Sequence, residues 1–179
     1  MIDIQEILID EQTIIEKVRE MASRISKDYA GKEVVLISVL KGAAVFTADL
    51  MRHISIPVIV DYMQAASYGM SMTSSRNIII KKDMETDIRD KHVLLVDTII
   101  DTGETIDCLV KKIRERGPAS LRTVALLDKR SRRLVDVPVD YLGFTIPDKF
   151  VVGYGLDCEE QFRNLPSIAV VTKSCDIPK

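Results

Sequence analysis

Hydrophobic residues recur along this chain with two alternating spacings. Over residues 10–29 they return every three or four positions, which predicts an amphipathic helix that Asp10 or Thr13 begins and Gly31 ends. The run Val34–Leu40 is instead unbroken and rich in β-branched side chains, as in strands buried on both faces. The same reasoning predicts further strands at residues 57–63, 77–81, 92–96, 121–127, 140–144, 150–154 and 168–171, a helix at about 43–53, and a helix after Thr105 that Gly117 and Pro118 stop.

A segment of small and polar residues at 65–75 interrupts this pattern. It predicts a long loop between two strands, which is either a lid over a ligand site or a plain disordered hairpin. Elsewhere strands alternate with helices, so we expect one α/β domain over residues 1–179, built on a twisted, mainly parallel sheet flanked by helices. In such sheets ligands bind at the carboxyl ends of the strands.

Composition narrows the class of protein. With 179 residues, 46% of them hydrophobic, the chain is large enough for one sizeable core. Its net charge of −2 provides no field for nucleic acid, and no apolar run reaches the ~18 residues of a membrane span. Acids near Met1 do not fit a signal peptide, and Cys108, Cys158 and Cys175 lack a CxxC spacing. We therefore expect free thiols, a cytoplasmic protein, and no nucleic-acid or membrane partner.

The turn that follows the strand at 92–96 carries the strongest chemical signal. Asp97 and Asp101 are followed by Thr102, Gly103 and Thr105 at the start of a helix, where backbone N–H groups and hydroxyls can hold a phosphate monoester. The lysine of a Walker A loop is missing. Carboxylates beside a phosphate repel it unless they bind sugar hydroxyls, a metal or a proton. A ribose 5-phosphate has hydroxyls for the carboxylates and a phosphate for the start of the helix, so it fits the whole turn. The alternative is a solvated helix start with acids placed for the helix dipole.

This turn, VLLVDTIIDTGET, resembles the phosphoribosyl-pyrophosphate loop of type I phosphoribosyltransferases. Four other segments resemble the hypoxanthine-guanine phosphoribosyltransferases, and the similarity covers nearly the whole chain. They are SVLKGAAVFTADL (38–50), SYG (67–69), LLDKR (126–130) and IPDKFVVGYGLDCEEQFRNLP (146–166). The resemblance implies the type I phosphoribosyltransferase fold, with a small hood lobe formed by the N-terminal residues and about 145–179, and a mobile lid at about 65–76.

The resemblance also implies an activity. Enzymes of this family transfer the 5-phosphoribosyl group from 5-phosphoribosyl-1-pyrophosphate to N9 of hypoxanthine or guanine, which gives IMP or GMP and pyrophosphate in purine salvage. They use Mg²⁺ and form homodimers or homotetramers. The transition state is oxocarbenium-like, so catalysis should consist mostly of positioning and electrostatics.

Individual roles follow from the same resemblance. Asp101 matches the general base at purine N7, and Lys129 the donor to the 6-oxo group, which selects 6-oxopurines over adenine. Phe150 matches the aromatic residue that stacks on the base, while Val151 and Asp157 match residues that read its other edge. The pyrophosphate site, where the family often has a cis peptide, is matched by Lys41, Gly42 and Arg163, and the lid by Ser67 and Tyr68. The Mg²⁺ ligands are matched by Asp97 and Asp157. The ribose-phosphate site is matched by Asp97, Thr98, Asp101, Thr102, Gly103, Glu104 and Thr105.

Two adjacent positions depart from the family pattern. Asp97 and Thr98 stand where the family usually has Glu–Asp, so one carboxylate is lost. This keeps open a non-catalytic, nucleotide-sensing regulator that binds nucleic acid, although Asp101, Lys129 and Arg163 are present and the net charge is −2. A second alternative is a transferase of the same fold that acts on xanthine, orotate, uracil or adenine. Lys129 favours a 6-oxopurine, and we expect hypoxanthine and guanine to be preferred over xanthine.

Overall fold

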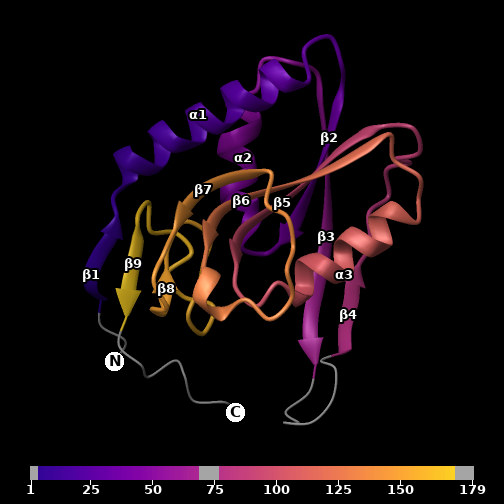
Figure 1. The fold of residues 1–179 in the computed structure, drawn as a ribbon. Helices are drawn as coiled ribbons and strands as arrows, with labels where there is room; N and C mark the ends of the chain where they lie inside the picture. Colours follow the sequence, from indigo (N-terminus) through magenta and orange to yellow (C-terminus); the bar gives the residue numbers. More distant parts are fainter. Residues whose placement is uncertain (1–3, 69–76, 172–179) are drawn as a thin grey trace.

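The computed structural model describes residues 4–68 and 77–171, which form a six-stranded sheet and a separate three-stranded sheet (Figure 1). The strand order is β4-β3-β2-β5-β6-β7 in the larger sheet and β1-β9-β8 in the smaller one. The strands are β1 (Ile4–Ile9), β2 (Val34–Leu40), β3 (Val58–Tyr68), β4 (Asn77–Lys82), β5 (His92–Ile100), β6 (Ser120–Asp128), β7 (Tyr141–Thr145), β8 (Val151–Val152) and β9 (Ile168–Val171), and the helices are α1 (Glu11–Asp28), α2 (Ala43–His53), α3 (Glu104–Arg114) and the 3₁₀ turn η1 (Arg130–Arg132).

The larger sheet is mainly parallel, which confirms the predicted fold class. β3, β2, β5, β6 and β7 all run in the same direction, and β4 pairs antiparallel with β3. Alternate residues of β2 enter two different cores. Val34 and Leu36 pack with α1 and α2, whereas Val35 and Ile37 pack on the face that α3 covers. Burial on both faces explains why β2 reads as an unbroken hydrophobic run.

The start of α1 also matches its prediction. Asp10 caps the helix, because its carboxylate accepts the backbone N–H of Thr13 at 2.8 Å. The buried face of α1 consists largely of the predicted apolar positions, among them Ile14, Val18 and Met21. This packing fixes α1 against the sheet beside α2.

Four elements differ from the sequence prediction. β5 continues to Ile100, so residues 97–100 belong to the strand and not to the turn expected after residue 96, because they pair with β6. β3 continues to Tyr68 because it pairs with β4, so residues 65–68 of the expected loop are strand, while 69–76 lie outside the described residues. β1 was not predicted at all, since its side chains are mostly exposed and its pairing with β9 joins opposite ends of the chain. The strand expected at 150–154 shrinks to Val151–Val152, because Gly153 and Tyr154 take positive φ angles of 96° and 48°.

The structure tests two expectations from the sequence, that the cysteines are free thiols and that no segment spans a membrane. Cys108 is free, as expected, but Cys158 is disulfide-bonded, so the prediction of free thiols is wrong for that residue. Spacing along a sequence cannot show which distant cysteines meet in space. None of the helices among residues 4–68 and 77–171 has the length and apolar character needed to span a membrane.

Candidate active site

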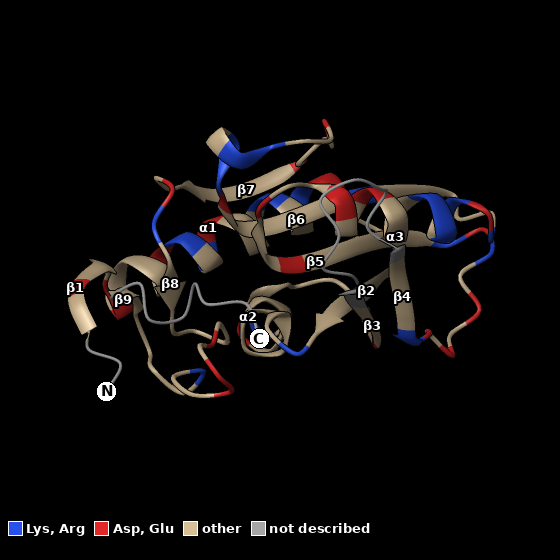
Figure 2. Ribbon diagram, turned by 90° about the horizontal axis from the view of Figure 1, so that it is seen from below, with Lys and Arg blue, Asp and Glu red and all other residues tan. Residues whose placement is uncertain are grey.

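The carboxyl ends of β2, β5 and β6 lie next to one another because these strands are neighbours in the parallel sheet. Figure 2 views the molecule from this edge. Lys41 follows β2, Asp97 lies in β5 three residues before its end, and Lys129 follows β6, so segments far apart in sequence meet here. The backbone N–H of Lys129 donates to the carbonyl of Ile100 at 2.9 Å, which places Lys129 beside Asp101.

A small cavity opens where β5 meets α3. Its volume is about 120 Å³, and Gly103 at its rim has φ of +88°, a conformation that favours glycine. A Cβ on Gly103 would lie 2.5 Å from the carbonyl oxygen of Val135, so no other residue fits without a shift. The lining consists of Asp97, Ile99, Ile100, Asp101, Thr102, Gly103, Thr105 and Ile106. The cavity therefore brings together five of the seven residues predicted to bind a ribose phosphate.

The remaining two predicted residues sit outside the lining. Glu104 is the first residue of α3, and its carboxylate accepts the hydroxyl of Thr102 at 3.0 Å. Thr98 is fully buried and does not line the cavity. The cavity offers the start of a helix and hydroxyl groups, which together suit a phosphate monoester.

Asp97 has an unusual electrostatic environment. Burial raises the pKa of its carboxyl to about 7, although the N–H groups of Thr98 and Ile99 act in the opposite direction. Its Oδ1 accepts the N–H of Thr98 at 2.7 Å. Within the described part of the chain no cation pairs with Asp97, so the carboxylate is ready for a sugar hydroxyl or a cation.

Asp101 has a cationic partner that sequence reasoning missed. Nε of Arg132, in η1, lies 2.9 Å from Oδ1 of Asp101, and Nη1 of the same arginine lies 3.5 Å from Asp148. Arg132 thus links Asp101 to the segment that leads to Phe150. The run of arginines at 130, 132 and 133 was the available signal, since three cations after one strand exceed what a turn requires.

Lys129 is nearly enclosed, with 6% of its surface exposed. Over the residues that the structure describes, its ammonium group takes part in no recorded hydrogen bond or ion pair. The adjacent carboxylate of Asp128 is paired with Arg133, which donates to it, and not with Lys129. Lys129 is therefore available to donate to a ligand at the rim of the site.

The predicted pyrophosphate residues form a connected group. Glu160 Oε2 accepts from Lys41 Nζ at 2.9 Å and lies 3.4 Å from Arg163 Nη2. Arg163 also lies 2.7 Å from Asp157 Oδ1 and donates to the carbonyl of Gly155 at 2.7 Å. Glu160 was missed by the sequence analysis, because nothing local marks it as the link between Lys41 and Arg163.

The loop at Lys41–Gly42 touches the segment that follows β8. The Leu40–Lys41 peptide is cis, and Gly155 has φ of +94°. A side chain on Gly155 would overlap the carbonyl oxygen of Gly42. The two backbones therefore approach each other directly.

The other predicted residues are placed less completely. Phe150 is partly buried against a small core that includes Val152 and Ala169, and its carbonyl accepts the N–H of Val171 at 3.2 Å. Val151 is buried in β8. The backbones of Ser67 and Tyr68 belong to β3 and pair with β4, and the rest of the expected lid lies outside the described residues.

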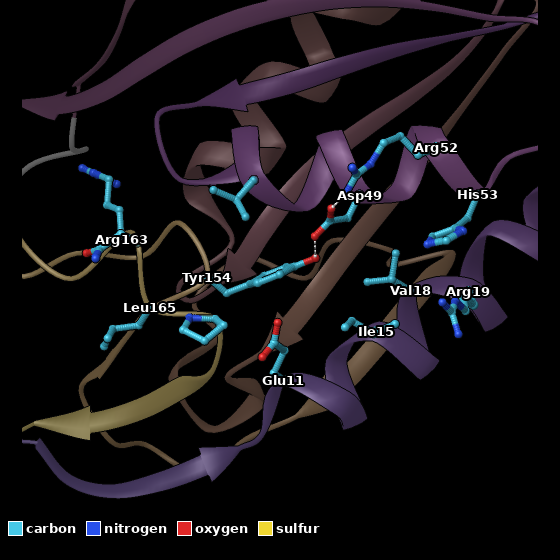
Figure 3. Close-up of a pocket in the computed structure, with 13 residues that line it drawn as sticks. Glu11, Ile15, Val18, Arg19, Asp49, Arg52, His53, Tyr154, Arg163 and Leu165 are labelled. Carbon is cyan, nitrogen blue, oxygen red and sulfur yellow. Dashed lines mark hydrogen bonds and ion pairs between the residues drawn. The ribbon is translucent and has the colours of Figure 1, made fainter.

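A larger groove of about 680 Å³ lies between α1, α2 and the segment after β8 (Figure 3). Arg163 is the one predicted site residue that lines it. Its lining mixes apolar side chains such as Val18 and Leu165 with charged ones such as Glu11 and Arg52, and Tyr154 donates to Asp49 across it at 2.6 Å. Five of the seven predicted ribose-phosphate residues line the smaller cavity and none lines this groove, so size alone does not locate the chemistry here.

In this fold an acidic segment of β5 borders a small cavity at the start of α3, on a mainly parallel sheet. This arrangement is that of the type I phosphoribosyltransferase class. The chain belongs to the phosphoribosyltransferase family, because the family model of the phosphoribosyl transferase domain matches residues 5–159.

Individual relatives narrow the comparison. The chain is 44% identical to a hypoxanthine-guanine phosphoribosyltransferase of Streptococcus pneumoniae over 94% of both chains. It is 45% identical to a hypoxanthine phosphoribosyltransferase of Salmonella typhimurium, over 93% of this chain and 94% of that protein. A solved hypoxanthine-guanine phosphoribosyltransferase from Bacillus anthracis superposes with a TM-score of 0.90 at 44% identity, covering 96% of this chain and 99% of the other. A hypoxanthine phosphoribosyltransferase from Staphylococcus aureus gives a TM-score of 0.93 at 38% identity, with 98% and 96% covered.

Proposed function

We propose that this chain is a hypoxanthine-guanine phosphoribosyltransferase of purine salvage. It transfers the 5-phosphoribosyl group from 5-phosphoribosyl-1-pyrophosphate to N9 of hypoxanthine or guanine and releases pyrophosphate. The observation that carries this proposal is that Lys129, an enclosed lysine, is joined through its backbone N–H to Ile100, next to Asp101, which lines the phosphate-sized cavity. The names of the relatives support the same activity.

The mechanism follows from the position of each group. The 5-phosphate binds at the start of α3 against Thr102, Gly103 and Thr105, and Asp97 binds the ribose hydroxyls. As the bond between C1′ and the purine nitrogen forms, the purine becomes cationic and its N–H becomes more acidic. Asp101 then accepts the proton from N7, since a weak base is sufficient at that point.

Base selection depends on Lys129. Its ammonium group donates to the 6-oxo oxygen of hypoxanthine or guanine, whereas the 6-amino group of adenine presents a second donor. Phe150 stacks on the ring, and Val151 and Asp157 contact its other edge. We propose that hypoxanthine and guanine are preferred over xanthine.

Pyrophosphate binds against Lys41, Gly42 and Arg163. Arg163 is held by Asp157 and Glu160, which orients its guanidinium group beside the loop at Gly42. Ser67 and Tyr68 close over the site and exclude water, which would otherwise hydrolyse the sugar donor.

The donor set fits Mg²⁺. Asp97 is a half-buried carboxylate with no cationic partner among residues 4–68 and 77–171, and Asp157 is a second carboxylate close to the pyrophosphate residues. Mg²⁺ usually binds one or two carboxylates together with substrate phosphates, and in proteins it seldom relies on a cage of side chains alone. When bound, the ion would neutralise charge that develops on the leaving pyrophosphate.

We further propose that the protein acts in the cytoplasm as a homodimer or homotetramer. The acidic composition and the absence of an apolar span support the location. Exposed apolar side chains on α2, Val45 and Met51, support self-association. Sedimentation of the purified chain tests the assembly.

The decisive experiment is a turnover assay with 5-phosphoribosyl-1-pyrophosphate, Mg²⁺ and hypoxanthine, guanine, xanthine or adenine in parallel. We expect IMP and GMP to form, little xanthosine monophosphate, and no AMP. The matched variant Lys129→Gln should raise the KM for hypoxanthine about tenfold, because it loses a charged hydrogen bond. Absence of nucleotide product from every base, together with RNA retention at moderate salt, would instead favour a non-catalytic regulator.

A further inference from the structure

We infer that Thr98 positions the pyrophosphate-binding loop and does not contact the ribose. The inference rests on the proposed function, because it assigns Lys41 and Gly42 to pyrophosphate. Thr98 is one of the two residues where the ribose-phosphate turn departs from the family pattern, so its role cannot be carried over from relatives.

The side chain of Thr98 faces away from the ribose-phosphate cavity. It is fully buried, and it is absent from the lining to which its neighbours Asp97 and Ile99 contribute. Its Oγ1 is enclosed and has no hydrogen-bond partner among residues 4–68 and 77–171. A buried hydroxyl without a partner destabilises the folded chain, so such groups mark places where a partner arrives with a ligand or a movement.

The hydroxyl lies at the junction of three segments. A Cβ on Gly42 would be 3.9 Å from Thr98 Oγ1, and 3.7 Å from both the Gly155 carbonyl oxygen and a methyl carbon of Leu156. Thr98 is therefore next to the loop after β2 at the point where that loop meets the segment after β8.

The geometry of the peptide bond suggests how the Thr98 hydroxyl acts on the loop at Lys41–Gly42. An anion above the loop attracts backbone N–H groups, and in a trans peptide the carbonyl then points the opposite way, into the protein. The Lys41 carbonyl accepts the N–H of Ala44 at 3.2 Å, and a carbonyl oxygen has a second lone pair. When pyrophosphate binds, that lone pair would accept Thr98 Oγ1–H, which has no partner within the described part of the free chain. The hydroxyl would then hold the loop with its N–H groups toward pyrophosphate. It does so without adding a negative charge beside a highly charged anion, as a carboxylate would.

The test compares Thr98→Val, which removes the hydroxyl at constant shape, with Thr98→Ser, which retains it. Calorimetry in the presence of Mg²⁺ measures the affinities for pyrophosphate and for IMP. We expect Thr98→Val to weaken pyrophosphate binding about five- to tenfold, the value of one hydrogen bond, and to raise the KM for 5-phosphoribosyl-1-pyrophosphate similarly. IMP affinity should stay within about twofold, and Thr98→Ser should restore pyrophosphate binding.

Thermal unfolding supplies an independent readout. Because Thr98 Oγ1 has no partner in the free protein, Thr98→Val should leave the Tm unchanged or raise it. Thr47→Val is the matched control, since Thr47 is equally buried but donates to Ser38 Oγ at 2.8 Å. That control should lower the Tm and leave pyrophosphate affinity unchanged.

Two results would overturn the inference. If Thr98→Val weakens IMP as much as pyrophosphate, the hydroxyl contacts the ribose phosphate. If Thr98→Val lowers the Tm and changes neither affinity, the hydroxyl is only structural. A native chain that binds neither ligand and forms no IMP would refute the proposed function itself, and this inference with it.

Discussion

Asp101 is the residue on which the proposed chemistry depends most directly. We expect Asp101→Asn to lower kcat by about 10² to 10³, because a positioned general base contributes factors of this size. Affinity for 5-phosphoribosyl-1-pyrophosphate should change little, since the proton moves only in the transition state. Steady-state kinetics with hypoxanthine measure both quantities. A variant that retains the native kcat would remove Asp101 from this role.

The raised pKa of Asp97 leads us to expect that the stability of the folded chain falls as the pH rises. Burial raises the pKa of its carboxyl to about 7 in the folded chain, well above the ordinary value of an aspartate in water, so the folded state binds the proton more tightly. Ionisation of Asp97 therefore opposes folding progressively as the pH rises from about 4 to 7, and the loss is complete above pH 7. Because the side chain is partly accessible, we expect Asp97→Asn to stabilise the chain by about 1–3 kcal/mol at pH 8.

Denaturant unfolding at pH 8 and at pH 4 checks this expectation. The advantage of Asp97→Asn should shrink to a small remainder at the lower pH, because the folded-state carboxyl is then protonated and the unfolded-state carboxyl is only partly ionised. An advantage of equal size at both pH values would show that packing, and not charge, causes it. The same variant should bind 5-phosphoribosyl-1-pyrophosphate less tightly, because it loses a carboxylate that faces the cavity.

At the residue scale, sequence reasoning found the groups that stand in motifs and missed those defined by contacts. Asp97, Asp101 and Gly103 are close in sequence, and they are also close in the cavity. Arg132 and Glu160 gain their importance from partners across the fold, Asp101 and Lys41 respectively. No spacing along the chain encodes those pairs.

The start of α3 is the element with the tightest steric demand. Gly103→Ala should destabilise the chain by about 2 kcal/mol or more, because it adds the cost of a positive φ to a clash with the Val135 carbonyl. Gly31→Ala is the control, since Gly31 has φ of +75° but nothing within 4 Å of an added Cβ. The control isolates the φ penalty, which we expect to be about 1 kcal/mol.

Differential scanning calorimetry and donor binding distinguish the two glycine variants. Gly103→Ala should also weaken binding of 5-phosphoribosyl-1-pyrophosphate, because the clash displaces the N–H groups at the start of α3. Gly31→Ala should not affect binding. Equal Tm losses in the two variants would contradict the steric account of Gly103.

Elements were predictable where their own residues determine them. β2 and α1 follow from a buried run and a helical spacing, and both boundaries agree closely with the structure. β1 and the last third of β3 depend on partners, β9 and β4, that lie elsewhere in the chain. In both segments the pairing is with a strand that is not fixed by the segment's own hydrophobic pattern.

Across the whole molecule, acid stability should depend strongly on Asp61. Burial alone would raise the pKa of this carboxyl, but backbone N–H groups of Thr86, Tyr62 and Glu85 outweigh it and lower the pKa to about 2. Asp61 thereby ties β3 to the segment before β5. It contributes about 2 kcal/mol above pH 4, which is lost as the pH falls from about 4 to 2.

Acid titration of the native chain and of Asp61→Asn measures this contribution. The native free energy of unfolding should fall through that window, while Asp61→Asn should start lower at pH 7 and fall less. Parallel curves for the two proteins would exclude Asp61 as the cause.

The α/β class of the whole fold was predictable from the alternation of strands and helices alone, but the strand order and the separate small sheet depend on contacts between distant segments.

The close backbone contact between Gly42 and Gly155 limits how substitutions can change the pyrophosphate site. Backbone lies against backbone there, so no side chain is available at that point to be enlarged or trimmed. Point mutation can therefore retune the purine end of the site, where side chains line the contact, more readily than it can widen the diphosphate end. A variant that accepts a bulkier leaving group would need a rerouted loop, through insertion or deletion, in one of the two segments.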